Sequence, residues 1–535
     1  MDKDITDITG ESLLSDNYND LTARSESLGL SDISHTSSLT RKSIPFSEIN
    51  QESFSTAIGT VVPDWNPDDL NGTAESIANA LYSASQQSTQ QPEHPQTRHL
   101  HDENLKWKRF LDQNDAKALW HAIGWNGKLH TQPTDCPSDK NFQTHFENLL
   151  NPVRDSDPLE GLDFNQSPHI PVLDDPISVI EYDKAVKQMK PNKAAGCNGV
   201  SPGIFRILPA LWIVTIITFL NICLAQSTIP IHWMKSKLIT VFKKGQSHLC
   251  TNYRGIAISN SFAKLYDAIL SNRLKQWYKP DPLQAGAQSG RDCVEHILCL
   301  RLLIAYAKRK KLKLWLLFID FRQAYDRVPR DKLMEELSRA GCGGTFLRAL
   351  KALYGCTKFI LRSAVINATV GVKQGSPLSC LLFVFYLEQM VQFIRRLPAD
   401  GFLEQLHCLL YMDDTVLLAT NRRACIEKLK CVLDFCDQYG MVINQQKTKV
   451  MVINGSKDDE TAITAGDLTV EHADSYWYLG SPITADGSMK TALQRHVEDK
   501  SKHILKFMTF LNYNYNMPFP LKKKVANACV LSAIL

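Results

Sequence analysis

The sequence lacks the cysteine pairs that mark most structural zinc sites. It contains 14 cysteines, but no two of them stand in a CxxC arrangement. The densest group, Cys425, Cys431 and Cys436, has no histidine at a spacing that suits shared metal ligands. We therefore expect reduced and mostly buried thiols in an intracellular protein, and neither a zinc site nor a disulfide framework.

The sequence also lacks segments that direct a protein to or through a membrane. The residues that follow Met1 have neither the basic nor the apolar block of a secretory signal. The longest apolar run, Leu211 to Ala225, has 15 residues and includes polar ones such as Asn221. A bilayer needs about 20 apolar residues, so this run predicts a buried helix and no membrane partner.

Charge is distributed unevenly along the 535 residues. Residues 1–100 carry 15 acidic and 5 basic side chains, whereas the other residues carry 41 acidic and 55 basic ones. A basic body suits a polyanionic partner, because neutralised phosphates release their counterions. Charge alone does not separate such a partner from an ordinary basic surface.

Composition and periodicity divide the chain into four parts. Residues 1–100 are rich in Ser, Thr, Asn, Asp and Gln, and such a segment buries too little apolar surface to fold, so we predict disorder. Residues 101–174 have a helical pattern typical of a linker region. Residues 175–484 alternate between helical and extended patterns, and residues 485–535 begin a further helical part. The fold class predicted is α+β.

The middle part has the clearest strand and helix signals. We expect a buried strand, two arms of a hairpin, a helix and a last pair of short strands. These lie at 314–319, 408–411 with 416–419, 422–439, and 441–443 with 450–453.

Three carboxylates stand at the ends of these strands. Asp320 follows the buried strand, and Asp413 and Asp414 form the tip of the hairpin. Either feature alone is more often a strand boundary or a solvated turn. Together they favour catalysis, because clustered carboxylates repel one another unless divalent cations neutralise them. Such oxygen ligands suit Mg²⁺, and two ions about 3.5–4 Å apart can assist an in-line displacement.

A series of motifs in the chain resembles the motifs of reverse transcriptases, and their order and spacing resemble the non-LTR, LINE-type retrotransposon branch. The first three motifs are similar to the family's NKAPGPDG, NYRPI and QAGFRxGRS motifs, in that order. The later four are similar to its palm motifs, which include the YxDD box. In chain order the seven motifs are Asn192–Val200, Asn252–Ile256, Gln284–Gly286 with Gly290–Arg291, Phe318–Val328, Val372–Ser379, Tyr411–Asp414 and Ile443–Lys449.

This resemblance implies a right-hand polymerase fold. Fingers and palm would occupy 175–484, and a partial helical thumb would follow over 485–535. No endonuclease, zinc knuckle or RNase H acidic set is recognisable, and the helical pattern stops at Leu535. The expectation is therefore a polymerase part that lacks the endonuclease and is truncated in the thumb.

The resemblance also implies the residues that hold metal. Asp320 and Asp413 would hold two Mg²⁺ ions, for which Mn²⁺ is an alternative, and Asp414 would complete the cluster. The backbone carbonyl of Phe321 would add a ligand. Lys447 would lie near the leaving pyrophosphate as a proton donor, although a solvated lysine at a strand end fits the pattern nearly as well.

Substrate-binding roles follow in the same way. Arg254, with Lys243 or Lys244, would grip the triphosphate of the nucleotide. Tyr325 stands at the family's steric-gate position, where a ring crowds a ribose 2′-OH; the alternative is an ordinary core tyrosine. Gln374 and Gly375 would let the backbone approach the template and nucleotide. Ser376 and Pro377 also predict the start of a helix that runs toward Phe393.

The function implied is RNA-directed DNA polymerisation, with an RNA template, a DNA primer and dNTPs as partners. The primer 3′-OH would attack the α-phosphate of the dNTP, and pyrophosphate would leave. The first alternative is a degenerate element product that only binds nucleic acid. The second is an RNA-dependent RNA polymerase, against which Tyr325 and the motif at 374–377 argue.

Overall fold

The computed structural model describes residues 41–89, 135–152, 159–355, 357–515, 517–527 and 531, and the chain divides into two compact units. The larger unit comprises 25–91 and 132–473, and the smaller one comprises 1–24, 92–131 and 474–535. The disorder predicted for 1–40 and 90–100, and the linker predicted for 101–134, lie outside the described residues.

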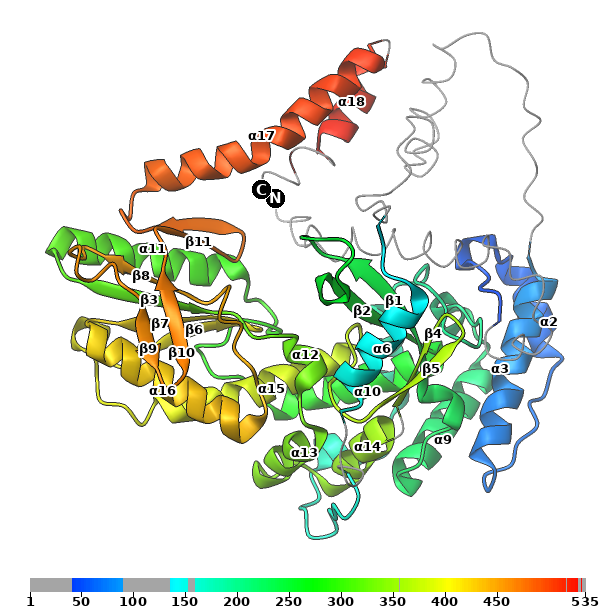
Figure 1. Ribbon diagram of the computed structural model, residues 1–535. Helices are drawn as coiled ribbons and strands as arrows, with labels where there is room; N and C mark the ends of the chain where they lie inside the picture. The colour runs from blue at the N-terminus through cyan, green and yellow to red at the C-terminus, as the bar shows by residue number, and fades with distance from the viewer. Residues whose placement is uncertain are drawn as a thin grey trace. The chain divides into compact units, whose positions relative to one another are not determined.

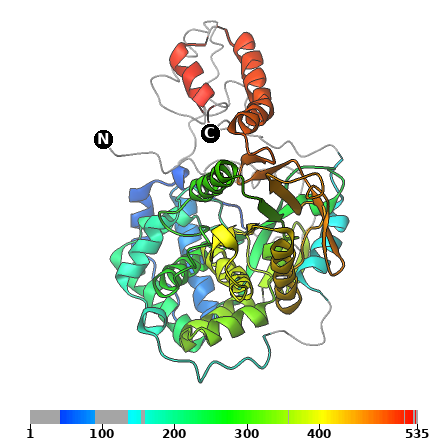
Figure 2. The same cartoon turned by 90° about the vertical axis from the view of Figure 1, so that its left-hand side faces the viewer.

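The larger unit is built from helices packed around two sheets (Figures 1 and 2). Its α-helices are α2 (Gln51–Gly59), α3 (Leu70–Gln87), α6 (Asp139–Leu150), α7 (Pro171–Asp174), α8 (Val179–Gln188), α9 (Ala210–Gln226), α10 (Ser261–Trp277), α11 (Cys293–Lys310), α12 (Ala324–Arg327), α13 (Arg330–Arg339), α14 (Gly344–Gly355), α15 (Pro377–Ile394) and α16 (Arg422–Tyr439). Its strands are β1 (Lys235–Phe242), β2 (Tyr253–Ser259), β3 (Leu314–Ile319), β4 (Thr357–Leu361), β5 (Ala364–Ala368), β6 (Cys408–Tyr411), β7 (Asp414–Ala419), β8 (Lys449–Ile453), β9 (Ile463–Ala465) and β10 (Leu468–His472).

The amino-terminal helices α2 and α3 differ from the disorder predicted for 1–100. Phe54 and Ile58 of α2 and Leu81 of α3 are fully buried. The indole nitrogen of Trp212 in α9 donates a hydrogen bond to the Ile58 carbonyl at 3.2 Å. The average composition is polar, but the apolar residues recur at helical spacing and give each helix one face to bury. Residues 41–89 therefore fold as part of the larger unit.

The six-stranded sheet has the strand order β6-β7-β3-β8-β10-β9, and β3 lies inside it with every residue buried. β3 pairs antiparallel with β7 on one side and with β8 on the other. Helix α16 packs on β3, β7 and β9, and α11 contacts β6 and β8. The strand, hairpin and helix predicted at 314–319, 408–419 and 422–439 are confirmed.

One predicted pairing within this sheet is wrong. The run at 441–443 was expected to pair with 450–453, but β8 pairs with β3, and Ile443 forms only an isolated bridge with Phe321. Both runs are apolar and short, so their pattern identifies a buried extended chain without identifying its partner. The bridge brings the chain after α16 beside the residue that follows Asp320.

The four-stranded sheet has the order β2-β1-β4-β5 and carries a small core of its own. Phe142, Phe146 and Leu150 of α6 pack against it and are buried. The amide of Ala257 in β2 donates to the Gln374 carbonyl at 2.9 Å. This bond joins the four-stranded sheet to the segment that precedes α15.

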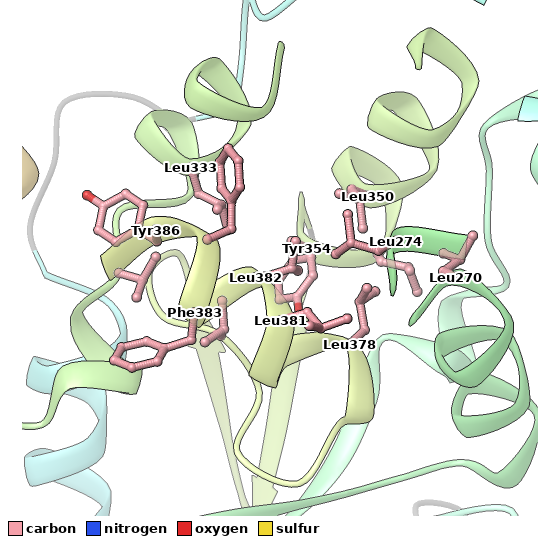
Figure 3. Close-up of a cluster of buried hydrophobic side chains, with 14 of the residues drawn as sticks. Leu270, Leu274, Leu333, Leu350, Tyr354, Leu378, Leu381, Leu382, Phe383 and Tyr386 are labelled. Carbon is pink, nitrogen blue, oxygen red and sulfur yellow. The ribbon is translucent and has the colours of Figure 1, made fainter. Parts of the chain in front are cut away.

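Helix α15 is the centre of the main core. Figure 3 shows leucine and aromatic side chains of α10, α13, α14 and α15 packed into one cluster. The labelled residues are Leu270, Leu274, Leu333, Leu350, Tyr354, Leu378, Leu381, Leu382, Phe383 and Tyr386. Each fully buried side chain of this size contributes about 1.5–3 kcal/mol. Among the described residues α15 alone is long and apolar enough to cross a membrane, but most of it is buried, as in a core helix of a globular protein.

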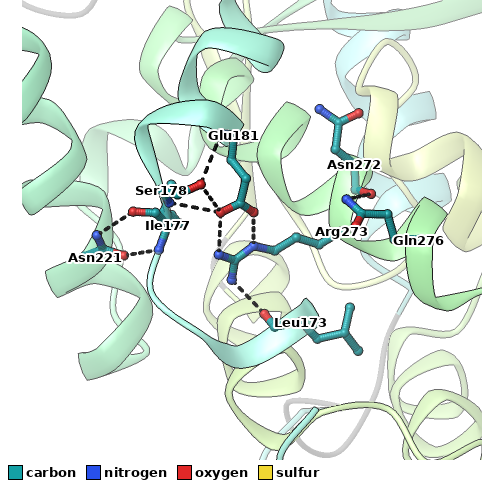
Figure 4. A network of polar contacts seen from close by, with 8 residues as sticks. All are labelled: Leu173, Ile177, Ser178, Glu181, Asn221, Asn272, Arg273 and Gln276. Atoms are coloured by element: carbon teal, nitrogen blue, oxygen red, sulfur yellow. Dashed lines mark hydrogen bonds and ion pairs between the residues drawn. The ribbon is translucent and has the colours of Figure 1, made fainter. Parts of the chain in front are cut away.

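A polar network fastens α8 to α10 beside this core (Figure 4). The guanidinium of Arg273, which is 2% exposed, donates to both carboxylate oxygens of Glu181, at 2.7 and 3.1 Å, and to the Leu173 carbonyl at 2.8 Å. Burial alone would raise the pKa of Glu181, but the hydrogen bonds from Arg273 and Ser178 outweigh it, and this pKa is lowered. Ser178 and Glu181 also form the capping box that begins α8.

The smaller unit contains a hairpin of β11 (Ser475–Tyr478) and β12 (Ser481–Thr484), then α17 (Met489–Tyr513) and α18 (Phe519–Ala526). Asp486 accepts hydrogen bonds from Thr484 and Thr491, which ties the hairpin to the first turn of α17. The boundary between the units falls between residues 473 and 474, whereas the sequence predicted a change after residue 484.

We expect Arg273→Ala to destabilise the protein, because it removes the guanidinium that donates to the partly buried Glu181 carboxylate and to the Leu173 carbonyl. The free energy of unfolding should fall by about 3–4 kcal/mol, the lower part of the range for breaking a buried ion pair. Arg423→Ala is the matched control, since its pair with Glu427 on α16 is exposed and is worth about 0.3–0.5 kcal/mol. Urea denaturation followed by circular dichroism measures both; equal losses would contradict the argument.

Candidate active site

The three carboxylates predicted to act together meet at the ends of β3 and β7. The last paired residues of these strands are Ile319 and Thr415. Asp320 follows one and Asp414 precedes the other, so the antiparallel register carries these two residues to adjacent positions. Asp413 lies in the tight turn between β6 and β7, whose first residue, Met412, has a φ of +56°.

These carboxylates interact electrostatically. Burial raises the pKa of Asp413, and the Asp320 carboxylate raises it further against the opposing charge of Arg254. Asp414 is exposed at the strand end, yet protein surrounds much of its carboxyl group. Burial and then repulsion from Asp413 and Asp320 raise its pKa to about 6. The fold therefore holds three acidic groups close together at a cost in electrostatic energy.

The donor set fits hard divalent cations in its chemistry. Asp320 Oδ2 is buried and accepts no hydrogen bond, and the Lys447 ammonium lies 3.5 Å from it. As they stand, no three His, Cys, Asp or Glu side chains within the described part of the chain form a complete metal site. Carboxylates that repel one another spread apart without a cation, and Mg²⁺ normally takes part of its shell from water and substrate phosphates.

The backbone of Asp320 is held by the turn that follows the bridge at Ile443. The Asn444 amide donates to the Asp320 carbonyl at 2.7 Å, and the Asp320 amide donates to the Thr448 hydroxyl at 3.2 Å. Lys447 belongs to the same turn, which places its ammonium beside the Asp320 carboxylate. The sequence predicted a role for Lys447 alone, whereas Asn444 and Thr448 of the same motif position the catalytic strand end.

Basic side chains of the four-stranded sheet face the carboxylates. Arg254 of β2 is exposed, and its charge acts on Asp413 and Asp414. Lys243, just past β1, interacts with Asp413 and Asp320, while burial and the charges of Arg254 and Lys447 lower its pKa. The positively charged groups thus stand opposite the acidic ones, as a binding site for a polyphosphate requires.

Tyr325 lies between the carboxylates and the core. Its ring stacks on Phe383 of α15, with centroids 4.2 Å apart and planes 14° from parallel. Burial raises its pKa, and the Cys380 thiol and the Asp413 carboxylate raise it further. The ring is only partly buried, and its role as a steric gate stays a prediction.

Gln374 and Gly375 form the loop that begins α15. Gly375 has a φ of +109°, and a Cβ there would stand 2.9 Å from the Ala257 carbonyl oxygen of β2. The glycine is therefore required by the approach of β2, while the approach of a nucleotide stays a prediction. Ser376 and Pro377 begin α15 as expected, although the Ser376 hydroxyl makes no capping bond. Phe321 is buried beside Ile443.

Asp326 lies beside these residues, although no role was predicted for it from the sequence. Both of its carboxylate oxygens accept from the Gln374 side-chain amide at 2.9 Å. Burial raises its pKa to about 7, against the lowering effects of the Gln374 bond and of Lys243, Arg254 and Arg327. The sequence contained a clue to this position, since Asp326 follows Tyr325 directly in the first palm motif. Charged residues in a surface helix share that pattern, so spacing alone did not distinguish it.

Comparison with known proteins finds similarity to reverse transcriptases. Residues 241–483 match the sequence profile of a family described as reverse transcriptase (RNA-dependent DNA polymerase). A Xenopus laevis protein, the transposon TX1 uncharacterized 149 kDa protein, is 24% identical over 59% of this chain and 25% of its own length. The Pol polyprotein of the type-1 retrotransposable element R2 from Popillia japonica is 27% identical, over 51% of this chain and 39% of its own.

A third relative is the RNA-directed DNA polymerase from mobile element jockey of Drosophila funebris, 22% identical over 63% of this chain and 38% of its own length. The chain thus spans well under half the length of these curated relatives. Among solved structures, telomerase from Candida albicans in complex with a fragment of telomeric RNA aligns with a TM-score of 0.35 at 13% identity, covering 63% of this chain and 64% of that one. Apo telomerase from Candida tropicalis aligns with a TM-score of 0.32 at 14% identity, covering 47% and 54%.

The partly buried Asp326 makes stability depend on pH. An aspartate in an unfolded chain has a pKa near 3.9, and the folded value is about 7, so the folded state binds the extra proton between these values. The contribution of Asp326 to the free energy of unfolding is therefore greatest at low pH, and it is lost as the pH rises toward 7. Asp326→Asn removes the titration, and wild type should lose more stability than this variant between pH 5 and pH 8.

Thermal unfolding midpoints in EDTA at the two pH values measure this difference. Asp434→Asn, on an exposed position of α16, is the control and should follow wild type. Parallel pH profiles for wild type and Asp326→Asn would show that Asp326 titrates normally.

Proposed function

We propose that this chain, whose residues 241–483 are a reverse transcriptase domain of the non-LTR retrotransposon type, copies RNA into DNA by transferring nucleotides from dNTPs to a primer 3′-OH. The observation that carries the proposal is the β3–β7 register, which sets Asp320 beside the Asp413–Asp414 turn. Cations of the four-stranded sheet face these carboxylates, as a site for a nucleoside triphosphate needs.

Reverse transcriptases use divalent metal ions. For this chain we propose that Asp320 and Asp413 hold two Mg²⁺ ions, that Asp414 completes the set, and that Mn²⁺ can replace them. The Phe321 carbonyl is a further proposed ligand. When bound, such ions activate the attacking hydroxyl and neutralise charge on the leaving oxygen. The raised pKa values of Asp413 and Asp414 support this assignment, because a bound cation relieves the repulsion that raises them.

Basic side chains of the chain are assigned to bind the triphosphate. We assign Arg254 and Lys243 to its oxygens, because a guanidinium fork and an ammonium both suit phosphate, and both lie opposite the carboxylates. Lys447 is assigned to protonate the departing pyrophosphate. Its 3.5 Å pair with Asp320 places it at the edge of the acidic cluster, from which it can turn to a phosphate.

Tyr325 and the loop at Gln374 are assigned to the nucleotide itself. The Tyr325 ring, held by its stack on Phe383, would crowd a ribose 2′-OH and so favour dNTPs over rNTPs. The Gln374 side chain, held by Asp326, and the Gly375 backbone would line the same nucleotide site. The stacking partner and the Asp326 pair support rigid placement of both groups.

Asp413→Asn should abolish primer extension on an RNA template, because the neutral amide is a poor ligand for divalent cations. We expect a loss on the order of 10³-fold in kcat, and chelation by EDTA should remove the activity of wild type. Asp437→Asn, an exposed aspartate of α16, should keep full activity. Wild-type protein that binds RNA in a salt-sensitive way but extends no primer would replace the proposal with simple nucleic-acid binding.

Tyr325→Ala should weaken discrimination against rNTPs, because it removes the ring that would exclude the 2′-OH. The ratio of kcat/KM for dNTP over rNTP should fall on the order of 10–100-fold, in the range that contacts of this size provide. Tyr325→Phe keeps the ring and the stack on Phe383, so its ratio should match wild type. An unchanged ratio in Tyr325→Ala would make Tyr325 a core residue.

A further inference from the structure

The segment at 283–286 contains the motif Gln284–Gly286, to which the proposed function assigns no role, and it lies against the hairpin that carries Asp413. It extends the edge of β6, since the Leu410 amide donates to the Leu283 carbonyl at 2.8 Å and the Ala285 amide donates to the Leu410 carbonyl at 2.9 Å. Gln284 pairs with Leu410 as a parallel bridge. The motif is thus an added strand that reaches the turn before Asp413.

The side chain of Gln284 continues this pairing onto the turn. Its Oε1 accepts from the Met412 amide at 2.9 Å, and its Nε2 donates to the Met412 carbonyl at 3.3 Å. The same Oε1 accepts from the Gly286 amide at 2.8 Å. A side-chain amide here replaces one peptide group of a neighbouring strand, and it is completely buried.

Met412, whose backbone Gln284 binds, has a strained conformation. Met412 has a φ of +56°, a left-handed conformation that is unfavourable for a residue with a long side chain. Its amide and carbonyl are both fixed by Gln284, so neither peptide that flanks Met412 can rotate freely. Asp413 follows directly, and its carboxylate position depends on the orientation of that peptide.

Gly286 packs closely against Met412 of this turn. A Cβ at this position would stand 2.5 Å from the Met412 amide nitrogen and 2.6 Å from its Sδ. Such contacts are shorter than real Cβ atoms show, so any larger residue must displace the turn. The glycine and the glutamine of one motif therefore act on the same peptide.

We infer that Gln284 is a positioning residue of the polymerase: its buried amide fixes the Met412 turn and thereby sets where Asp413 and Asp414 present their carboxylates to divalent cations. The inference rests on the proposed function. Gln284 lies beneath the turn and bonds only to backbone groups, so it acts on catalysis through the hairpin alone.

Gln284→Met is the direct test, since it keeps the length of the side chain and removes its hydrogen bonds. We expect kcat to fall about 10–100-fold, the equivalent of losing buried hydrogen bonds. The Mg²⁺ concentration for half-maximal activity should rise, and KM for dNTP and binding of primer–template should change little. Gln288→Met is the matched control, because Gln288 donates to the backbone carbonyls of Asp281 and Gln284, and its substitution leaves the side-chain bonds between Gln284 and Met412 in place.

A second readout does not need activity. Mn²⁺ binding to the free protein, followed by electron paramagnetic resonance, should be several-fold weaker in Gln284→Met than in wild type or Gln288→Met. If Gln284→Met fails to fold, Gly286→Ala displaces the same turn while every hydrogen-bonding group stays in the chain, and it should show the same weaker Mn²⁺ binding. Gly355→Ala is its control, since a Cβ there meets nothing within 4 Å.

The inference is overturned if folded Gln284→Met, or Gly286→Ala in its place, keeps the kcat and Mn²⁺ affinity of wild type. It is also overturned if Gln288→Met loses as much as Gln284→Met. The proposed function fails separately, when wild type itself extends no primer. Mn²⁺ binding then still decides whether Gln284 positions the carboxylates.

Discussion

Repulsion among three carboxylates is the constraint on which the rest of this structure depends. Beyond the effect of burial, the Asp320 carboxylate raises the pKa of Asp413, and both carboxylates together raise that of Asp414, so the chain around them must be rigid enough to keep them together. The β3–β7 ladder supplies the register, and β3 is buried along its whole length. Rigid strands hold catalytic groups more accurately than loops do, which explains why the site stands on strand ends.

Two short segments, distant in sequence, complete the support. The turn at 444–448 bonds to the backbone of Asp320, and the segment at 283–286 bonds to the backbone around Met412. Both hold the backbone through amide and hydroxyl groups, and the turn at 444–448 also brings the Lys447 ammonium beside the Asp320 carboxylate. The four-stranded sheet brings the opposing charges, and Ala257 and Gln374 join it to the core.

Local patterns were reliable where one periodicity ran through a whole element. The apolar strand before Asp320, the two arms of the hairpin and the helices α15 and α16 all follow from such patterns. Residues 41–89 were misjudged because average polarity concealed an apolar face, and 441–443 was given the wrong partner. Pairing is a long-range property, and a run of three apolar residues fits any free strand edge equally well.

The sequence by itself determined the kinds of group at the site and the elements that carry them, because strand and helix patterns depend on neighbouring residues. It placed Asp320 at a strand end and Asp413 in a turn without any knowledge of the fold. Only the tertiary structure decided what holds them: Gln284 lies 128 residues before Met412, and the two meet through one buried pair of hydrogen bonds. Contacts between such distant residues depend on how strands pair and pack, and no local pattern records them.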